Sequence, residues 1–421
     1  MANFAQRKIA RESVEGAGTI VPDGIELPAE SVEGTLADIE HDTKPIDQND
    51  AEADVMAEDG DETDAQLDSV DAAEAAASGE GEGDDGEEPM EAEEDMPDEA
   101  AEQLDVAQES IRKRWAFEHR VSVARESYGA RNRRQVARES LWDDIKAFLQ
   151  RIYEWLKEQG RKIKDRWLKF SNQGKSIQSR AKKYDAALRG LGKQKKDTVS
   201  GGFIKNLTTG GKFVGDDVNT LKGVMSTIGG IYGEQDAVVA AATQMVAGVE
   251  GGKLSSGFAA AVNKATAGKA GEVQLLGNQI GKAEVKVNGE ELEASFTVID
   301  AEGSVEQSVS TPSIQTLTSL AAFFNQLGKA VEENVKAYHK NNQAQEKYEQ
   351  AIEKLLKRID GVKIDDNAEL TSNVRVARRA ITVANQYISW TERCVAAGQK
   401  NLIAGVNGYI SAGIGAYEKS K

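Results

Sequence analysis

The sequence predicts a mainly α-helical protein, in which a disordered acidic N-terminal segment precedes a helical body with one small β-hairpin. Three observations predict this class. The first third of the chain is strongly acidic and poor in apolar residues. Several later stretches carry apolar residues at helical spacing. One short stretch alternates apolar and polar residues around Asn288-Gly289, which is a strong hairpin signal.

Charge divides the 421-residue chain into two parts of opposite sign. Residues 1–139 contain 13 Lys and Arg against 39 Asp and Glu, a net charge of −26. Residues 140–421 contain 39 against 31, a net charge of +8, and the two values sum to −18. Residues 35–110 contain no aromatic side chain and few apolar ones, so burial cannot offset the entropy of ordering and disorder is expected. We therefore treat 1–139 as an acidic segment, separate from the body.

The body begins with a basic, Trp-rich helical segment over 140–200, with 16 basic and 7 acidic residues. Ser140 is a suitable N-cap, and Asp143 follows three residues later as in a variant capping box, so we expect the helix to start at Ser140. The apolar stripe of this helix consists of Trp142, Ile145, Phe148, Leu149, Ile152, Trp155 and Leu156.

Two further regions complete the expected body. In 201–311, the Gly- and Ala-rich residues 201–282 predict short helices broken by glycines, and 283–299 predicts the hairpin. In 312–421, we expect one long helix from Pro312 to about Arg358 and another from about Ala368 to Gln399. A glycine-spaced tail ending near Tyr417 follows.

A short repeat is the most informative motif. Ala-Arg-Glu-Ser occurs at 10–13, 124–127 and 137–140, and Ser-Val-Glu-Gly occurs at 13–16 and 31–34. All copies have a small residue, any residue, Glu and a small residue, and the copies lie at the ends of the acidic segment, where an accessible linker would be cut. The alternative is a repeated linker or helix-capping motif. The candidate cleavage positions are Glu12, Glu15, Glu33, Glu126 and Glu139.

These repeats and the charge layout resemble the internal head and prohead core proteins of large myovirus-type tailed phages. The basic aromatic segment 140–183 is also similar to the helices of that group. The resemblance implies an acidic propeptide that the prohead protease removes after Glu. It also implies a structural virion protein inside the capsid, with the prohead protease and other head or core proteins as partners. The resemblance covers roughly 120–185 and the overall layout.

A basic body can bind phage DNA without sequence specificity, because Lys and Arg neutralise phosphates and release counterions. Cleavage at Glu139 would change the net charge from −18 to +8. The Trp-rich helix over 140–170 has three interpretations: a core or partner-packing stripe, a nucleic-acid face, or a helix inserted at a membrane surface. The candidate DNA-binding residues are Lys146, Arg151, Lys157, Arg161, Lys162, Lys164, Arg166, Lys182 and Lys183.

Nothing in the sequence predicts catalysis, a metal or a cofactor. The histidines His41, His119 and His339 lack metal-ligand spacing, and Cys394, the one cysteine, is expected to be a small buried residue. No apolar run is long enough to predict a spanning helix. We therefore expect no enzyme. Two other functions remain open: a protein ejected with the genome that acts on host membrane or host proteins, and an uncleaved nucleic-acid chaperone with an acidic tail.

Overall fold

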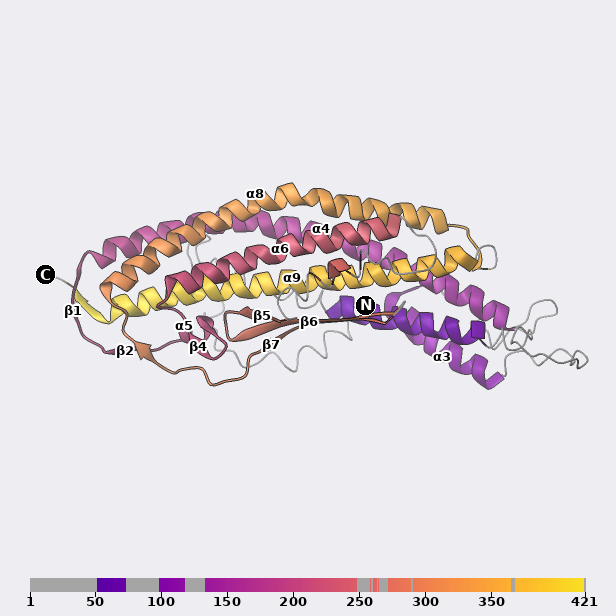
Figure 1. Cartoon of the computed structure of the whole chain (residues 1–421), viewed down its shortest axis with the longest axis horizontal. Helices are drawn as coiled ribbons and strands as arrows, with labels where there is room; N and C mark the ends of the chain where they lie inside the picture. The colour runs from indigo at the N-terminus through magenta and orange to yellow at the C-terminus, as the bar shows by residue number, and fades with distance from the viewer. Residues whose placement is uncertain are drawn as a thin grey trace, which may run out of the picture.

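The computed structural model describes residues 51–72, 98–117, 133–247, 272–288, 291–364 and 368–419, and a few helical residues between 258 and 264. Four long helices form the body and run side by side along the long axis of the molecule (Figure 1). They are α4 (Arg133–Leu188), α6 (Val218–Ala247), α8 (Ile314–Ile359) and α9 (Ala368–Gly415). The mainly α class with a small β element is confirmed.

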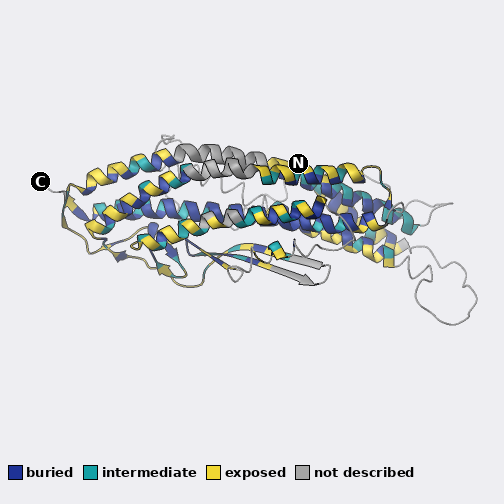
Figure 2. Cartoon of the chain, turned by 45° about the horizontal axis from the view of Figure 1, so that its top comes forward, coloured by how far each residue is buried: buried dark blue, intermediate teal, exposed yellow. Residues whose placement is uncertain are grey.

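The helix α9 lies at the centre of this bundle. It contacts α4, α6 and α8, and nearly every residue from 370 to 399 is buried or half-buried. In Figure 2 the buried residues follow the faces on which the helices meet. The expected burial of Cys394, which lies on α9, is confirmed, since its side chain is fully buried.

The long helix expected after Pro312 is confirmed as α8. Its N-cap is Ser313, whose hydroxyl accepts a hydrogen bond from the backbone N–H of Thr316 at 3.1 Å. The helix then runs without interruption to Ile359.

Three expected helix limits are wrong. The helix α4 begins at Arg133 rather than Ser140, and it continues through Gly160 to Leu188. The glycines of 218–247 do not break α6. The glycine-spaced tail belongs to α9, which ends only at Gly415.

Close helix packing explains the glycines of the α9 tail. A Cβ atom at Gly405 would lie 2.5 Å from Cγ of Leu207, and one at Gly413 would lie 2.6 Å from Cδ2 of Leu317. Real Cβ atoms do not approach other atoms so closely, so glycine is needed where α9 meets its neighbours. Tertiary packing here outweighs the low helix propensity of glycine.

The expected hairpin is confirmed and is part of a three-stranded antiparallel sheet. Strands β6 (Gln279–Asn288) and β7 (Glu291–Asp300) pair from Gln279↔Asp300 to Asn288↔Glu291. Strand β5 (Glu272–Leu275) adds a third strand that the sequence analysis missed. The turn from β5 to β6 needs left-handed backbone at Gly277 (φ 87°) and Asn278 (φ 57°).

The sheet packs on α9 through aromatic side chains. Phe296 lies edge-on to Tyr387 with ring centroids 5.6 Å apart, and Trp390 Nε1 donates to the carbonyl of Thr297 at 3.1 Å. Smaller two-stranded ladders and a single helical turn lie toward the end of the bundle that holds the C-terminus (Figure 1). They are β1 (Leu191–Gln194) with β9 (Tyr417–Lys419), β2 (Thr198–Val199) with β8 (Val309–Ser310), β3 (Thr208–Thr209) with β4 (Lys212–Phe213), and α5 (Phe203–Asn206).

Two parts of the acidic segment are helical and pack against the body. They are residues 51–72, which we call the acidic helix, and α3 (Asp98–Trp115). Figure 1 shows both toward the end of the bundle away from β1. The disorder expected over 35–110 is therefore wrong for these residues, because each helix buries a stripe of small and apolar side chains in the main core.

Candidate processing site and nucleic-acid interface

The acidic helix docks through an apolar stripe. Ala53, Met56, Leu67 and Val70 are buried in the same core as Ile152 and Trp155 of α4 and several residues of α9. Burial recurs at spacings of three and four, as on one face of a helix. Gly60, Thr63 and Asp64 occupy the middle of this face, and these residue types conceal the stripe in the sequence.

A buried ion pair lies at the centre of the contact. Nη2 of Arg378 on α9 is 2.7 Å from Oδ2 of Asp64, and both side chains have no exposed surface. The same nitrogen is 2.6 Å from Oδ1 of Asp61, which is largely exposed. Burial by itself lowers the pKa of the Arg378 guanidinium, but the charges of Asp64 and Asp61 raise that pKa above its ordinary value. The aspartates of the acidic helix thus compensate the positive charge of Arg378 inside the protein.

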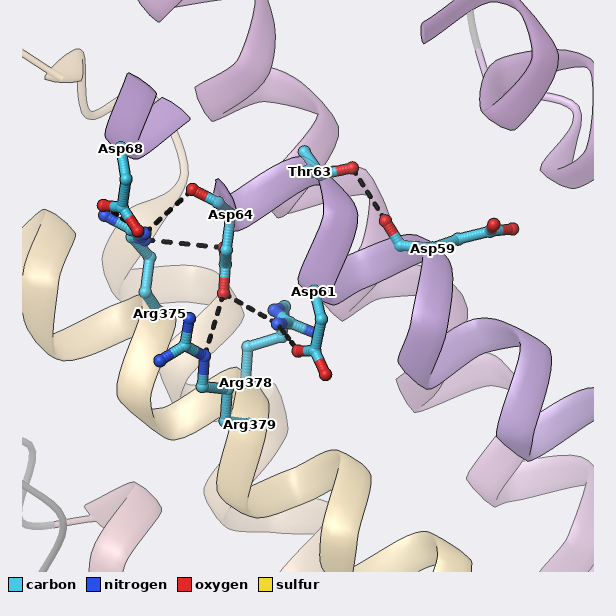
Figure 3. A network of polar contacts seen from close by, with 8 residues as sticks. All are labelled: Asp59, Asp61, Thr63, Asp64, Asp68, Arg375, Arg378 and Arg379. Atoms are coloured by element: carbon cyan, nitrogen blue, oxygen red, sulfur yellow. Dashed lines mark hydrogen bonds and ion pairs between the residues drawn. The ribbon is translucent and has the colours of Figure 1, made fainter. Parts of the chain in front are cut away.

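Two more arginines of α9 join the cluster shown in Figure 3. Nη2 of Arg375 is 2.6 Å from Oδ1 of Asp68 and donates to the backbone carbonyl of Asp64 at 3.0 Å. Nε of Arg379 is 3.3 Å from Oδ2 of Asp64. We call Arg375, Arg378 and Arg379 the α9 arginine cluster. Within the described part of the chain, every carboxylate that it contacts belongs to the acidic helix.

Further polar contacts hold the N-terminal half of the acidic helix. Arg151 of α4 binds Glu52 at 2.9 Å, and Gln386 of α9 donates to Asp54 at 2.9 Å. Arg114 of α3 binds Asp59 at 2.7 Å. The acidic helix therefore touches α3, α4 and α9 at once.

The bond after Glu139 lies inside α4. Glu139 is half-buried and Ser140 is buried, so this copy of the repeat is not an exposed linker. Arg112 of α3 donates from Nη2 to the Ser140 hydroxyl at 2.7 Å and forms an ion pair with Asp144 at 2.7 Å. The expected N-cap role of Ser140 is wrong, because two helical turns precede it and its hydroxyl accepts from an arginine. A protease that cuts at Glu139 must act on α4 with these turns unwound.

The other candidate cleavage positions lie outside the described residues. Glu12, Glu15 and Glu33 precede the acidic helix, and Glu126 falls within 118–132, between α3 and α4.

The candidate DNA-binding residues fall into three groups. Lys146 is paired with Asp143 at 2.6 Å and Arg151 is paired with Glu52 at 2.9 Å, so carboxylates of this chain already engage both. Lys157 lies over the ring of Tyr153 and is exposed, as are Lys182 and Lys183. The remaining four lie in α4 with side chains outside the described part. They are Arg161, Lys162, Lys164 and Arg166.

The apolar stripe of the Trp-rich helix belongs to the core. Leu141, Trp142, Ile145, Phe148 and Leu149 are all buried at 1% exposure or less. Over 141–156 the face that a membrane-surface helix would insert into lipid is covered in this structure, which favours the core interpretation of the stripe. Among the described residues, no helix combines the length and apolar character needed to cross a membrane.

An exposed basic surface extends beyond Lys183, and the sequence analysis named only part of it. Residues 175–196 contain eight basic residues and one acidic residue, Asp185. Most of these basic side chains are exposed at the end of α4 and in β1. We call this surface the basic end: Lys175, Lys182, Lys183, Arg189, Lys193, Lys195 and Lys196. The net charge of +9 over residues 140–200 is the sequence feature that indicates this basic surface.

The α9 arginine cluster was missed altogether. The sequence feature that could have indicated it is the presence of three arginines, Arg375, Arg378 and Arg379, on one face of a largely apolar helix. Arginines that enter a core need carboxylate partners, so this pattern predicts an acidic segment packed against the helix.

Comparison with known proteins identifies one family. The family model of phiKZ-like phage internal head proteins matches residues 41–412, a range that includes both the acidic helix and the whole bundle. No curated protein and no solved structure matches the chain.

Proposed function

Because the chain belongs to the phiKZ-like phage internal head proteins, we propose that it is the precursor of a DNA-associated, non-enzymatic protein of the phage head. The family describes structural proteins inside the capsid.

Processing is proposed after Glu126 and Glu139. Both follow the Ala-Arg-Glu-Ser pattern, and both separate the acidic part from most of the basic body. Cleavage at Glu126 leaves the described part of α4 intact, whereas cleavage at Glu139 requires its first turns to open. We therefore propose Glu126 as the first cut and Glu139 as a later one, made after Arg112 has released Ser140.

DNA association is proposed through the basic end. These side chains are exposed in the precursor and are accompanied by one acidic residue, so they are available for phosphate contacts. Docking of the acidic helix on the body carries the proposal, because its carboxylates occupy arginines of α4 and α9 and oppose the approach of DNA to that end of the bundle. Cleavage and release would remove that repulsion.

The test is co-expression of the full chain with the prohead protease of the phage that encodes it. Salt-dependent binding to duplex DNA is then measured for precursor and product. We expect the product to bind more tightly and with a steeper dependence on salt, because more phosphates are neutralised. Equal affinity and equal salt dependence of the two forms would refute the charge-switch part of the proposal. A control with Glu126→Gln and Glu139→Gln should retain precursor behaviour.

A further inference from the structure

We infer that the α9 arginine cluster is a second DNA-phosphate site, which the acidic helix covers in the precursor. This inference rests on the proposed association of the body with DNA and adds a site on a different helix from the basic end. The three arginines lie on one face of α9, and the guanidinium group suits bidentate contact with phosphate oxygens.

The source of the carboxylates is the first argument. Asp61, Asp64 and Asp68 all belong to one 22-residue helix, 51–72, and the body supplies no carboxylate to the cluster among the described residues. When the acidic helix leaves, three arginines of the same face lose their anions together. Charged groups need a replacement anion or water, and the phosphates of packaged DNA provide the former.

Incomplete pairing in the precursor is the second argument. Arg378 is fully buried, yet its Nε and Nη1 have no hydrogen-bond acceptor among the described residues. The two aspartates both contact Nη2, so the donors on Nε and Nη1 are unused. The carboxylates therefore cover the cluster but leave two hydrogen-bond donor nitrogens of Arg378 without an acceptor. Such incomplete pairing is what we expect of a segment that can be displaced by another anion.

The fit of the backbone is the third argument. Gly60 faces the guanidinium, and a Cβ atom there would lie 2.3 Å from Nη1 of Arg378. The absence of a side chain lets the acidic helix lie directly on the cluster, as Figure 3 shows for its neighbours Asp61 and Asp64. The backbone of the acidic helix thus packs closely on the arginines, in addition to the ion pairs that its aspartates form with them.

Two double variants of the full chain test the inference. The docking pair is Asp61→Asn with Asp64→Asn, and the control pair is Glu58→Gln with Glu62→Gln. Both change the net charge by the same amount in the same helix, but Glu58 and Glu62 are exposed and do not contact the arginines. Binding to a short duplex DNA is measured by fluorescence anisotropy at several salt concentrations.

The docking pair is expected to bind more tightly than the control pair. Its slope of log affinity against log salt should be steeper by about 2 to 3, since each neutralised phosphate contributes about 0.9. Adding Arg375→Gln and Arg379→Gln to the docking pair should reduce this gain by about two thirds, because Arg378 remains. Equal slopes for the two pairs, or a gain that the arginine substitutions leave undiminished, would overturn the inference.

The variant Gly60→Ala keeps the test decisive if the docking pair does not fold. It crowds the guanidinium of Arg378 without changing any charge, and hydrogen exchange of 51–72 shows whether the acidic helix is released. Tighter DNA binding on release supports the site, and unchanged binding overturns it. No step involves cleavage, so failure of the processing proposal leaves these outcomes unaffected. If the body released by cleavage also shows no salt-dependent DNA binding, the proposed DNA association itself fails.

Discussion

Asp64 and Arg378 bring a negative and a positive charge into the interior at the same point. Each loses its hydration, and their attraction offsets this only while both are present. The pair is therefore a poor source of stability but a strong determinant of where the acidic helix docks. Removing one partner leaves the other charge buried without a counter-ion, which is destabilising.

We predict that Asp64→Ala lowers the free energy needed to open the acidic helix from the body by about 3 to 5 kcal/mol. Asp68→Ala is the matched control, because Asp68 is 58% exposed and also binds an arginine of the cluster. It should cost at most about 1 kcal/mol. Hydrogen exchange of residues 51–72 measures both, and equal effects would contradict the burial argument.

For Asp71, in contrast to Asp64, we expect that removing the negative charge does not destabilise the fold. Burial raises its pKa above 3.8, and the nearby Arg138 lowers it less than burial raises it. Nε of Arg138 is 2.7 Å from Oδ1 of Asp71, and this ion pair offsets only part of the effect of burial on the pKa of Asp71. The folded state therefore disfavours the ionised carboxylate.

A raised folded pKa means that ionised Asp71 destabilises the fold at neutral pH, and that this cost disappears as pH falls through the folded pKa. We predict that Asp71→Asn is at least as stable as the parent chain at pH 7. The difference between the two should shrink toward zero as pH falls to 3.8. Thermal unfolding across this range checks the sign. A variant that is less stable at pH 7 and recovers on acidification would show that the ion pair outweighs burial.

Among the elements, α4 and α8 cross where two glycines face each other. A Cβ at Gly328 would lie 2.7 Å from the carbonyl oxygen of Gly174, and a Cβ at Gly174 would lie 2.6 Å from that of Gly328. The backbones of the two helices therefore touch at this point, where neither can move easily.

We predict that Gly328→Ala destabilises the protein by about 1 to 3 kcal/mol, because the helices must separate. Gly223→Ala in α6 is the control, since no atom lies within 4 Å of its added Cβ. That change should stabilise the protein by about 0.5 to 1 kcal/mol through helix propensity. Urea denaturation distinguishes the two, and the same sign for both would contradict the crossing.

The contact between α3 and α4 controls access to the Glu139 bond. We predict that Arg112→Met accelerates cleavage after Glu139 by a glutamyl endoprotease by about tenfold, the effect of losing about 1.4 kcal/mol of protection from local opening. Lys113→Met is the control, because Lys113 is exposed and pairs with Glu109 within α3 itself. Mass spectrometry of timed digests gives the rate. No acceleration by Arg112→Met would mean that α4 opens independently of α3.

Periodicity predicted the elements whose inward faces are apolar, and it failed where other residue types occupy those faces. The helix α8 and the β6–β7 hairpin carried clear signals in Ser313 and in Asn288-Gly289. The glycines of α6 and α9 suggested breaks, because only the neighbouring helices reveal that glycine allows close approach. The acidic helix presents Gly60, Thr63 and Asp64 inward, and the partner of Asp64 is Arg378, more than 300 positions away.

The site was predicted in part for the same reason. Local charge density indicated Lys182 and Lys183 at the basic end, and they are exposed. The α9 arginine cluster gave no comparable signal, because its role depends on the carboxylates that pack against it. The repeats identified candidate cleavage bonds, but burial of Ser140 by Arg112 follows from tertiary structure.

For the whole molecule, charge is separated along the long axis. The acidic helix and α3 lie toward one end, and the basic end lies near β1 at the other (Figure 1). Removing the first 139 residues would change the net charge from −18 to +8. It would also expose the part of α4 and α9 that the acidic helix covers. Both effects favour contact with DNA in a head where phosphate is abundant.

The most direct test of this account is the intact mass and N-terminal sequence of the protein from purified mature particles. We predict a chain that begins at Ser127 or Ser140 and contains the whole of the body from α6 onward. A chain that still begins at its first residues and retains the acidic helix would contradict removal of that helix, and the body would then meet DNA with its arginine cluster covered.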